Sequence, residues 1–426
     1  MNHALARAGY SLLLRLLTPA YLARLWWRGA REPLYRSAWH ERLGFYRGVP
    51  VPGRLWVHAV SLGETRAAAP LIDALRRSRP GLKLLLTHGT ATGREAGLAL
   101  LQVGDAQVWL PYDTPGAVRR FLRRHRPAVG VLMETEVWPN LLIAARESGV
   151  PMVLANARLS EKSLAKGRRV QALLRPTLDA LTTTLAQTEA DARRLRLSGV
   201  GAVQVSGNLK FDMTPNPGLL ARGQAWREAL ARPVVLAAAT REGEEAELLA
   251  AWAALPLPRP LLLLVPRHPQ RFDEAATLAA ATLPVVMRRS TWHEAPPAAA
   301  SAADVWVGDS IGEMPLYYGM ADAALLGGSF APFGGQNLIE AAACGCPLVM
   351  GPHTFNFAAA AELSIAAGAA ERASDMTDGV RRAVALADDP ARAQRVQAAL
   401  RFAAAHRGAA ERIAEQVGAL LDAARR

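Results

Sequence analysis

The chain has 426 residues, of which 51% are hydrophobic and 20% are charged, and its formal net charge is +13. This length exceeds what one hydrophobic core usually serves, so we expect two domains of about 200 residues each. The composition excludes a largely disordered or low-complexity protein, and the net positive charge favours an anionic partner, such as nucleic acid, acidic lipid or a phosphorylated substrate. Cys344 and Cys346 are too close for an ordinary disulfide and too few for a zinc site, so we expect two buried thiols in a reducing compartment.

The first 47 residues form a basic and hydrophobic arm. Eight arginines against two glutamates give residues 1–47 a charge of +6. Residues 10–27 are interrupted by arginines and by Pro19, and so lack the run of about 20 apolar residues that a simple membrane span needs. Trp26 and Trp27, followed by further arginines, suit the headgroup region of a bilayer. We expect an interfacial anchor on the cytoplasmic side of a membrane; the alternative is an amphipathic helix packed on the protein's own core.

Short apolar runs then alternate with helix-like segments, which is the pattern of a parallel sheet with crossover helices. In the first half the predicted strands are RLWVHAV, LKLLLTHGT, AVGVLMETE, PMVLANA, TTTLAQT and VQVSGN. After the proline-bearing segment 213–218, which reads as a linker, the predicted strands are PVVLAAA, PLLLLVPRHP, LPVVMRR, DVWVGDS, AALLGGS and PLVMGPH. The sequence therefore predicts an α/β fold with two Rossmann-like domains, whose strand ends face a central cleft.

Common nucleotide and metal motifs do not account for these strand ends. The chain contains no G-x-G-x-x-G dinucleotide fingerprint, no P-loop and no H-E-x-x-H motif. Dehydrogenase, NTPase and zinc protease functions therefore lose their best support.

Glu64 follows the first strong strand, in the segment AVSLGET. A carboxylate at this strand end would face the cleft. However, Ser61-x-x-Glu64 is also a helix capping box, in which Glu64 only satisfies backbone amides. The spacing alone leaves both interpretations open.

A second acidic group lies in METEVWPN, where Glu134 and Glu136 follow another predicted strand. Two neighbouring carboxylates can raise the pKa of one of them and favour proton transfer. Alternatively, these acids merely favour the start of the next helix electrostatically. Lys210, at the end of the last strand of the first half, could offset negative charge in the cleft or could be an ordinary exposed lysine.

The second half offers a candidate phosphate site. Arg267 follows a predicted strand, where a guanidinium can bind phosphate oxygens in a forked geometry. Residues 308–314 and 327–342 are glycine-bearing turns from strand to helix, and backbone amides at helix starts bind anions. Glu313 and Glu340 could accept hydrogen bonds from ribose hydroxyls or balance the helix dipole. The glycines could also serve only tight turns.

Ten ordered motifs resemble the 3-deoxy-D-manno-octulosonic acid (Kdo) transferases of lipopolysaccharide assembly. They run from about Tyr35 to Phe357 and are FYRG, VSLGET, LPYD, METEVWPN, NARLS, GNLKFD, VPRHPQRF, VGDSIGEM, GGQNLIEAA and MGPHTFNF. The resemblance implies a GT-B-type glycosyltransferase fold and transfer of Kdo from CMP-Kdo to the lipid A precursor (lipid IVA). It also implies a place on the cytoplasmic side of the inner membrane, beside an anionic membrane surface.

The resemblance implies a role for particular positions. Glu64 matches the proton acceptor, which takes the proton of the acceptor hydroxyl as that hydroxyl attacks the anomeric carbon with inversion. Glu134 and Lys210 match positions that support the transition state. The positions that match CMP contacts are Pro266, Arg267, Ile311, Gly312, Glu313, Asn337, Leu338, Ile339 and Glu340.

Three residues of the chain depart from the pattern of many family members. At these positions the chain has Gln336, Leu338 and Ile339 in place of His, Pro and Leu. The changes affect the expected details of the CMP pocket more than the expected identity of the donor. No Asp-x-Asp pair of the kind that holds a metal in many sugar transferases occurs, and the resemblance implies neither a metal nor another cofactor. Arginine, lysine and helix amides would then balance the charge of the leaving CMP.

The expected domain organisation has four parts. Residues 1–47 form the membrane-associated arm, 48–212 the acceptor domain, 213–232 a linker, and 233–426 the CMP-sugar donor domain with terminal helices. Competing hypotheses are another GT-B enzyme, such as a UDP-sugar transferase or a nucleotide-sugar epimerase, and a non-catalytic membrane adaptor. Nucleic-acid binding is disfavoured because the arginines lie beside leucines and tryptophans and no reader motif occurs.

Overall fold

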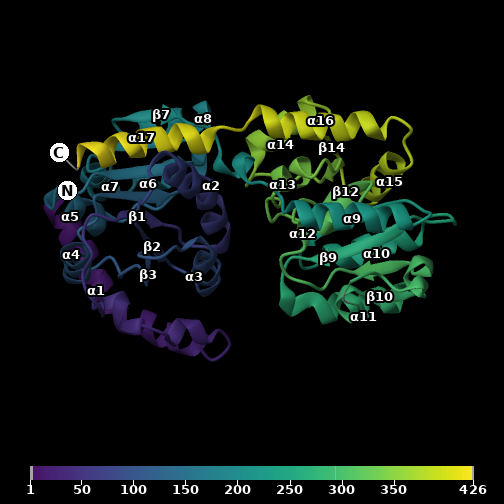
Figure 1. The fold of residues 1–426 in the computed structure, drawn as a ribbon, viewed down its shortest axis with the longest axis horizontal. Helices are drawn as coiled ribbons and strands as arrows, with labels where there is room; N and C mark the ends of the chain where they lie inside the picture. Colours follow the sequence, from purple (N-terminus) through teal and green to yellow (C-terminus); the bar gives the residue numbers. More distant parts are fainter. Residues whose placement is uncertain (1–2, 293, 425–426) are drawn as a thin grey trace. The chain divides into compact units, whose positions relative to one another are not determined.

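The computed structural model describes residues 3–292 and 294–424. The chain divides into two compact units, and each contains a seven-stranded parallel sheet (Figure 1). The first unit comprises Met1–Met213 together with Arg407–Arg426, and the second comprises Thr214–His406. The predicted α/β class with two Rossmann-like sheets is confirmed.

The sheet of the first unit has the strand order β3-β2-β1-β4-β5-β6-β7. Its strands are β1 (Leu55–His58), β2 (Leu84–His88), β3 (Ala106–Trp109), β4 (Val129–Met133), β5 (Met152–Ala157), β6 (Thr183–Ala186) and β7 (Val203–Val205). Its helices are α1 (His3–Arg28), α2 (Leu62–Ser78), α3 (Ala91–Gly97), α4 (Pro115–His125), α5 (Pro139–Glu147), α6 (Glu161–Arg168), α7 (Gln171–Leu178), α8 (Glu189–Ser198) and α17 (Ala409–Ala423). Short 3-10 helices are η1 (Pro33–Arg36), η2 (Trp39–Leu43), η3 (Leu98–Leu100) and η4 (Leu209–Asp212).

The sheet of the second unit has the order β10-β11-β9-β8-β12-β13-β14. Its strands are β8 (Val234–Thr240), β9 (Leu261–Pro266), β10 (Val286–Arg288), β11 (Val305–Val307), β12 (Ala323–Leu326), β13 (Leu348–Met350) and β14 (Ala370–Arg372). Its helices are α9 (Pro217–Ala229), α10 (Glu244–Ala253), α11 (Phe272–Thr282), α12 (Met314–Met320), α13 (Leu338–Ala343), α14 (Ala358–Ala366), α15 (Met376–Ala387) and α16 (Arg392–Ala405). The 3-10 helices are η5 (Pro269–Arg271), η6 (Arg289–Thr291) and η7 (Ala298–Ala302).

The central strands are buried on both faces, as parallel strands covered by helices must be. β1, β2 and β4 of the first unit and β8 and β9 of the second consist wholly of buried residues. This burial explains their continuous apolar runs in the sequence. Cys344 and Cys346 are both buried and unbridged, in agreement with the expectation of two buried thiols.

The last helix, α17, belongs to the first unit rather than to the second (Figure 1). Ile413, Val417 and Leu421 recur every four residues and join a buried cluster with the apolar face of α2. The Asp212 carboxylate accepts hydrogen bonds from the backbone N–H groups of Gly408 and Ala410, at 2.6 and 2.7 Å, and so fixes the start of the helix. The expected organisation had placed all terminal helices in the donor domain.

The expected linker at 213–232 is also different in the structure, because most of it is helix α9 of the second unit. α9 packs closely on α12, and glycines make the approach possible. A Cβ on Gly223 would lie 2.1 Å from the Leu316 carbonyl oxygen, and one on Gly319 would lie 2.6 Å from that of Leu220. Only the segment around Met213 and Thr214 separates the two units at this point.

Helix α1 packs on the first unit along one face and leaves its other face apolar and exposed. On the packed face, the Tyr10 hydroxyl donates to Asp113 at 3.0 Å, and Ser11 donates to Asn140 at 3.2 Å. The exposed apolar residues of α1 are Leu5, Leu12, Leu13, Leu16, Leu17, Tyr21, Trp26 and Trp27. In the part of the chain that the structure describes, no helix combines the length and apolarity needed to cross a bilayer.

The remainder of the expected arm packs against the first unit. Arg42, one of the arginines of the arm, is buried; it donates to the Gly89 carbonyl at 2.9 Å and stacks over Trp109 at 4.1 Å. The Glu41 carboxylate accepts from the Trp109 N–H at 2.7 Å. These contacts hold η2 against the end of β3. The arm is therefore not a segment separate from the domain.

Candidate active site

In the first unit, the predicted acidic residues lie at the point where the strand order reverses. β1 and β4 are neighbours in the sheet, although two strands separate them in the chain. Open parallel sheets bind ligands at this place, beyond the carboxyl ends of the strands. Glu64 follows β1 and Glu134 follows β4. The topology therefore brings together two carboxylates that are 70 positions apart in the sequence.

Glu64 completes a helix cap at the start of α2. Its backbone N–H donates to the Ser61 hydroxyl at 3.4 Å, and the carboxylate accepts from the Val60 N–H at 2.9 Å and from the Ser61 hydroxyl at 3.1 Å. The capping interpretation of Ser61-x-x-Glu64 is thus confirmed. Each carboxylate oxygen can accept two hydrogen bonds, and Glu64 is only half-buried, so the cap leaves acceptor positions for a substrate.

The surroundings of Glu64 make it a stronger base than an exposed glutamate. Burial raises the pKa of Glu64, and the negative charge of Glu134 adds to this effect. The hydrogen bonds from Val60 and Ser61 and the positive charge of Lys210 act in the opposite direction, but burial dominates. A base with a pKa nearer to neutrality transfers protons more effectively at physiological pH.

Glu134 is held between two cations. Lys210 Nζ lies 3.0 Å from one carboxylate oxygen and Arg158 Nε 3.2 Å from the other. Glu134 itself has a φ of 56°, a left-handed conformation that costs a non-glycine residue about 1 kcal/mol or more. Its backbone N–H donates to the Ala155 carbonyl at 2.9 Å. The structure therefore fixes the carboxylate of Glu134 together with Lys210 and Arg158. Arg158 was not among the predicted site residues.

Lys210 is positioned by asparagines rather than lying free in a loop. Asn208 accepts from the Lys210 N–H at 3.0 Å and begins η4, and Asn156, at the end of β5, accepts from the Leu209 N–H at 3.0 Å. Asn156 is fully buried and also has a positive φ, of 53°. The main chain around Lys210 is thereby tied to the neighbouring strand end, and its ammonium group reaches Glu134.

Glu136 faces a buried histidine. Burial, followed by the negative charges of Glu64 and Glu134, raises the pKa of Glu136 to about 7. His58 Nε2 lies 4.0 Å from the Glu136 carboxylate, within ion-pair range, but burial lowers the pKa of His58 to about 3. The imidazole is therefore neutral; its Nδ1 lies 2.9 Å from the Thr87 hydroxyl and 3.1 Å from the Thr87 carbonyl oxygen. The raised pKa expected in METEVWPN is thus found at Glu136.

The titration of Glu136 should appear in the stability of the protein. Between its ordinary pKa of 4.5 and the folded value of about 7, the folded chain binds more protons than the unfolded chain. The contribution of Glu136 to the free energy of unfolding is therefore largest below pH 4.5 and is lost as the pH rises through 7. For Glu136→Gln, we expect the free energy of unfolding relative to the parent to increase by about 2 kcal/mol between about pH 5 and about pH 8.

Urea denaturation at a series of pH values measures this difference. The same substitution at Glu95, an exposed residue of α3, serves as the control, and its free energy of unfolding should stay within about 0.5 kcal/mol of the parent at each pH. If the curves of Glu136→Gln and of the parent run parallel, Glu136 does not titrate in this range and its carboxyl group is not desolvated as described.

In the second unit, Arg267 and Glu340 both lie near Tyr318. Arg267 follows β9, and its backbone N–H donates to the Thr240 carbonyl at 3.0 Å. Burial raises the pKa of Tyr318 well above its usual range; the negative charge of Glu340 raises it further, and the positive charge of Arg267 opposes this shift. The structure thus brings Arg267 and Glu340 to the same end of the sheet, beside Pro266, the last residue of β9.

Glu313 is held by two arginines. Arg222 of α9 and Arg289 of η6 each approach its carboxylate to 2.9 Å, and the Ser310 hydroxyl donates to it at 2.5 Å. These partners fix the turn before α12, which contains the 75% exposed Ile311 and Gly312 with a φ of 86°. Glu313 therefore orders this turn through its protein partners. This role does not depend on whether its carboxylate also accepts a hydrogen bond from a ribose hydroxyl.

The other predicted CMP contacts lie where the loop after β12 leads into α13. Leu338 and Ile339 are 0% and 1% exposed, so their side chains are buried and are not presented to a ligand. Asn337 precedes α13, and its side-chain oxygen is buried without a hydrogen-bond partner among the described residues. This oxygen is available to a donor group of a ligand.

Glu244, which was not among the predicted site residues, fixes this loop. It is 1% exposed, and its carboxylate accepts four backbone hydrogen bonds. The donors are the N–H groups of Arg241, Gly328, Phe330 and Ala331, at 2.9, 2.7, 3.1 and 3.1 Å. The strand order of this sheet reverses between β8 and β12. Glu244 therefore joins the loop after β8 to the loop after β12, and both loops border this point. A glutamate at the start of a helix was its only signal in the sequence.

The predicted positions thus form two clusters, one in each unit. Glu64, Glu134 and Lys210 interact through their charges in the first unit. The predicted CMP residues lie in the second unit, at the end of β9, in the turn after β11, and at the start of α13, which follows β12. Among residues 3–292 and 294–424, no group of three or more His, Cys, Asp and Glu side chains is arranged to hold a metal ion.

Comparison with known proteins identifies the family. A family model described as 3-deoxy-D-manno-octulosonic-acid transferase (kdotransferase) matches residues 37–213. The chain is 49% identical over 425 residues to the 3-deoxy-D-manno-octulosonic acid transferase of Bordetella pertussis, covering 96% of this chain and 98% of that one. It is 34% identical over 385 residues to the Haemophilus influenzae transferase, covering 88% and 89% of the two chains.

Solved structures share the fold at low sequence identity. The chain is 14% identical to Anabaena HepE in complex with UDP, with a TM-score of 0.58 and coverage of 86% and 100% of the two chains. It is also 14% identical to the UDP-GlcNAc 2-epimerase of Neisseria meningitidis, with a TM-score of 0.55 and coverage of 86% and 99%. These likenesses concern the arrangement of two parallel-sheet domains, the GT-B type. Because relatives of 34–49% identity match it over nearly its whole length, the chain belongs to the family of the 3-deoxy-D-manno-octulosonic acid transferases.

Proposed function

We propose that this Kdo transferase moves Kdo from CMP-Kdo to the lipid A precursor with inversion, and that Glu64 is the proton acceptor. The observation that carries the proposal is the position of Glu64 at the reversal of strand order, beside the Glu134–Lys210 ion pair. In a single displacement, Glu64 takes the proton of the acceptor hydroxyl while that oxygen attacks the anomeric carbon. The bond to CMP breaks, and CMP leaves with the bonding electrons.

The first unit would bind the acceptor and the second the donor. Lys210 and Arg158 offset the negative charge of Glu134, so that Glu64 remains an acceptor of protons near an acidic sugar. On the donor side, Arg267, the turn before α12 and the amide groups of the loop after β12 can balance the single phosphate of CMP. The buried Asn337 oxygen, which lacks a described partner, could accept from the cytidine or its ribose.

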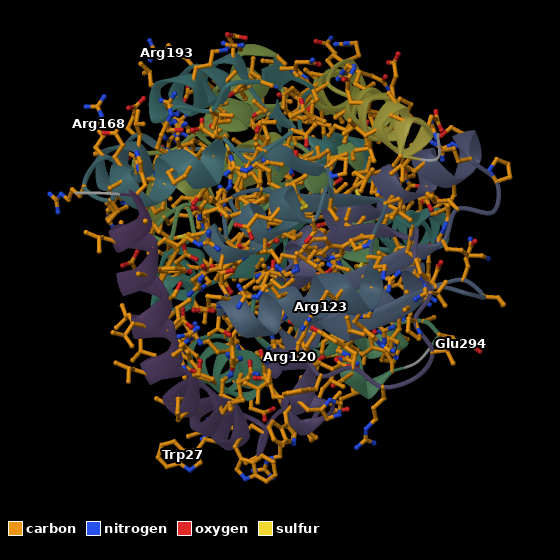
Figure 2. All side chains as sticks on the ribbon, turned by 90° about the vertical axis from the view of Figure 1, so that its left-hand side faces the viewer. Trp27, Arg120, Arg123, Arg168, Arg193 and Glu294 are labelled. Atoms are coloured by element: carbon orange, nitrogen blue, oxygen red, sulfur yellow. The ribbon has the colours of Figure 1, made fainter. Side chains whose placement is uncertain are left out.

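Helix α1 would hold the enzyme at the cytoplasmic surface of the inner membrane. Its exposed face carries leucines and tryptophans, and among them Trp27 (Figure 2) is 84% exposed. An amphipathic helix of this kind lies in the interface and does not cross it. The lipid acceptor is itself embedded in a bilayer, so an enzyme held at that surface meets its substrate directly.

The choice of donor can be tested by incubating the protein with lipid A precursor and one labelled donor at a time. We expect label to enter the lipid fraction from CMP-Kdo and not from a UDP-sugar. Transfer from the UDP-sugar would favour the alternative of a different GT-B enzyme. If CMP-Kdo is neither bound nor consumed, the alternative of a non-catalytic membrane adaptor would be preferred.

A further inference from the structure

A cavity in the first unit opens beside Glu134 and continues between α6, α7 and α8. Its volume is about 240 Å³. Its polar end includes Glu134, Thr135 and Arg158, and the rest of its wall is mostly leucine. The main apolar lining residues are Leu154, Leu164, Leu174, Leu178 and Leu195. Since an apolar cavity of roughly 150 Å³ can hold benzene, this one has room for part of an alkyl chain.

We propose that this cavity binds one acyl chain of the acceptor lipid and thereby positions the acceptor sugar. The proposal deepens the proposed function and depends on it. The polar end of the cavity is formed by the acid that is ion-paired to Lys210 beside Glu64. A chain in the cavity would therefore leave its polar attachment close to the proposed proton acceptor.

The charges around the helices that form the cavity match an anionic glycolipid. Arg168 of α6 and Arg193 of α8 are exposed and project outward from the surface (Figure 2), and no described carboxylate pairs with either of them. The nearby acids on the same helices are already paired, Glu161 with Arg194 at 3.4 Å and Glu189 with Arg196 at 3.0 Å. The surface beside the cavity therefore carries positive charge that can attract the phosphate groups of such a lipid.

The cavity also connects to the helix proposed to lie on the membrane. α1 packs against α7, and His3 Nδ1 of α1 lies 2.7 Å from the Ala172 carbonyl oxygen of α7. α7 contributes Leu174 and Leu178 to the cavity wall. An acyl chain that leaves the bilayer at α1 would therefore find the cavity on the adjoining helix.

Gly167 allows the cavity to be filled without disturbing the backbone. It lies in α6 and lines the cavity, and a Cβ added there would meet only Leu174 Cδ1, at 3.3 Å, within 4 Å. Leucine is also a better helix former than glycine. Gly167→Leu should therefore fold and occupy space between α6 and α7. Gly201→Leu is the matched control, because Gly201 is exposed and a Cβ there would meet nothing within 4 Å.

The test measures KM for a series of lipid A precursors whose acyl chains are progressively shortened. In the parent and in Gly201→Leu, KM should fall as the chains lengthen, since each buried methylene contributes roughly fourfold to binding. In Gly167→Leu this dependence should flatten, so that KM for the full-length acceptor rises about tenfold or more while kcat at saturation stays unchanged. Leu174→Ala, which enlarges the cavity, should shift the preference to longer chains.

Two results would overturn the acyl site. One is a parent enzyme whose KM does not depend on chain length. The other is the same chain-length dependence in the parent and in Gly167→Leu, which would mean that the chains remain in the bilayer or micelle. In both cases the parent enzyme still transfers Kdo. A failure of the proposed function would look different, because no acceptor of the series would then receive Kdo.

Discussion

Glu64→Gln is expected to lower the turnover number for Kdo transfer by about 10²–10⁴-fold, the usual contribution of a general base. Glutamine cannot take the proton of the acceptor hydroxyl, yet its amide oxygen can still accept the capping hydrogen bond from the Val60 N–H, and its NH2 group can donate to the Ser61 hydroxyl. It also removes a half-buried negative charge that faces Glu134. The variant should therefore lose transfer without losing stability or donor binding. Steady-state kinetics, thermal unfolding and CMP titration together measure these three properties.

Glutamine separates the two functions of Glu64 better than alanine, which would remove the helix cap together with the base. Glu411→Gln, in the first turn of α17, is the control and should retain parent activity. A Glu64→Gln enzyme that transfers Kdo at nearly the parent rate would leave Glu64 as a helix cap only. A variant that loses donor binding as well would point to a different role.

Glu244→Ala is expected to destabilise the second unit by about 3 kcal/mol or more. The substitution leaves four backbone N–H groups without their acceptor, and each buried donor left unsatisfied costs about 1–3 kcal/mol. The loop between β12 and α13 would lose its attachment to α10, so the affinity for CMP should fall as well. Urea unfolding followed by tryptophan fluorescence measures the first effect, and CMP titration measures the second.

Glu247→Ala provides the matched control, because Glu247 lies on the same helix and is exposed. Its free energy of unfolding should stay within about 0.5 kcal/mol of the parent. If Glu244→Ala were equally mild, the loop would have to be held by its other contacts. These include the Gly335 N–H, which donates to the Gly328 carbonyl at 2.7 Å.

The central strands were predictable from sequence because they are buried on both faces, and the edge strands were less so. The apolar runs at β1, β4, β8 and β9 predict the two sheets and the strand ends that carry the site. Two edge strands, β3 and β14, were not predicted. Both are partly exposed and short, with the sequences AQVW and AER, so no continuous apolar run marks them.

Contacts between distant parts of the chain account for most of what the sequence could not show. α17 returns to α2 across more than 300 positions, and an ion pair of 3.0 Å joins Arg77 to Glu411. Glu313 is paired with Arg222, 91 positions away. Likewise, the sequence could show that Ser61-x-x-Glu64 is a capping box, but only the strand order places Glu134 and Lys210 beside it. Local spacing identifies such residues, whereas their partners depend on the fold.

The anomeric configuration of the transferred sugar tests the central claim most directly. If Glu64 activates the acceptor hydroxyl for a single displacement, the Kdo in the lipid product must have the configuration opposite to that in CMP-Kdo, and NMR of the purified product reports it. Inversion, together with the loss of transfer in Glu64→Gln, is the predicted result. Retention of configuration would require two successive displacements at the anomeric carbon, and would contradict the role of Glu64 as the base of a direct attack.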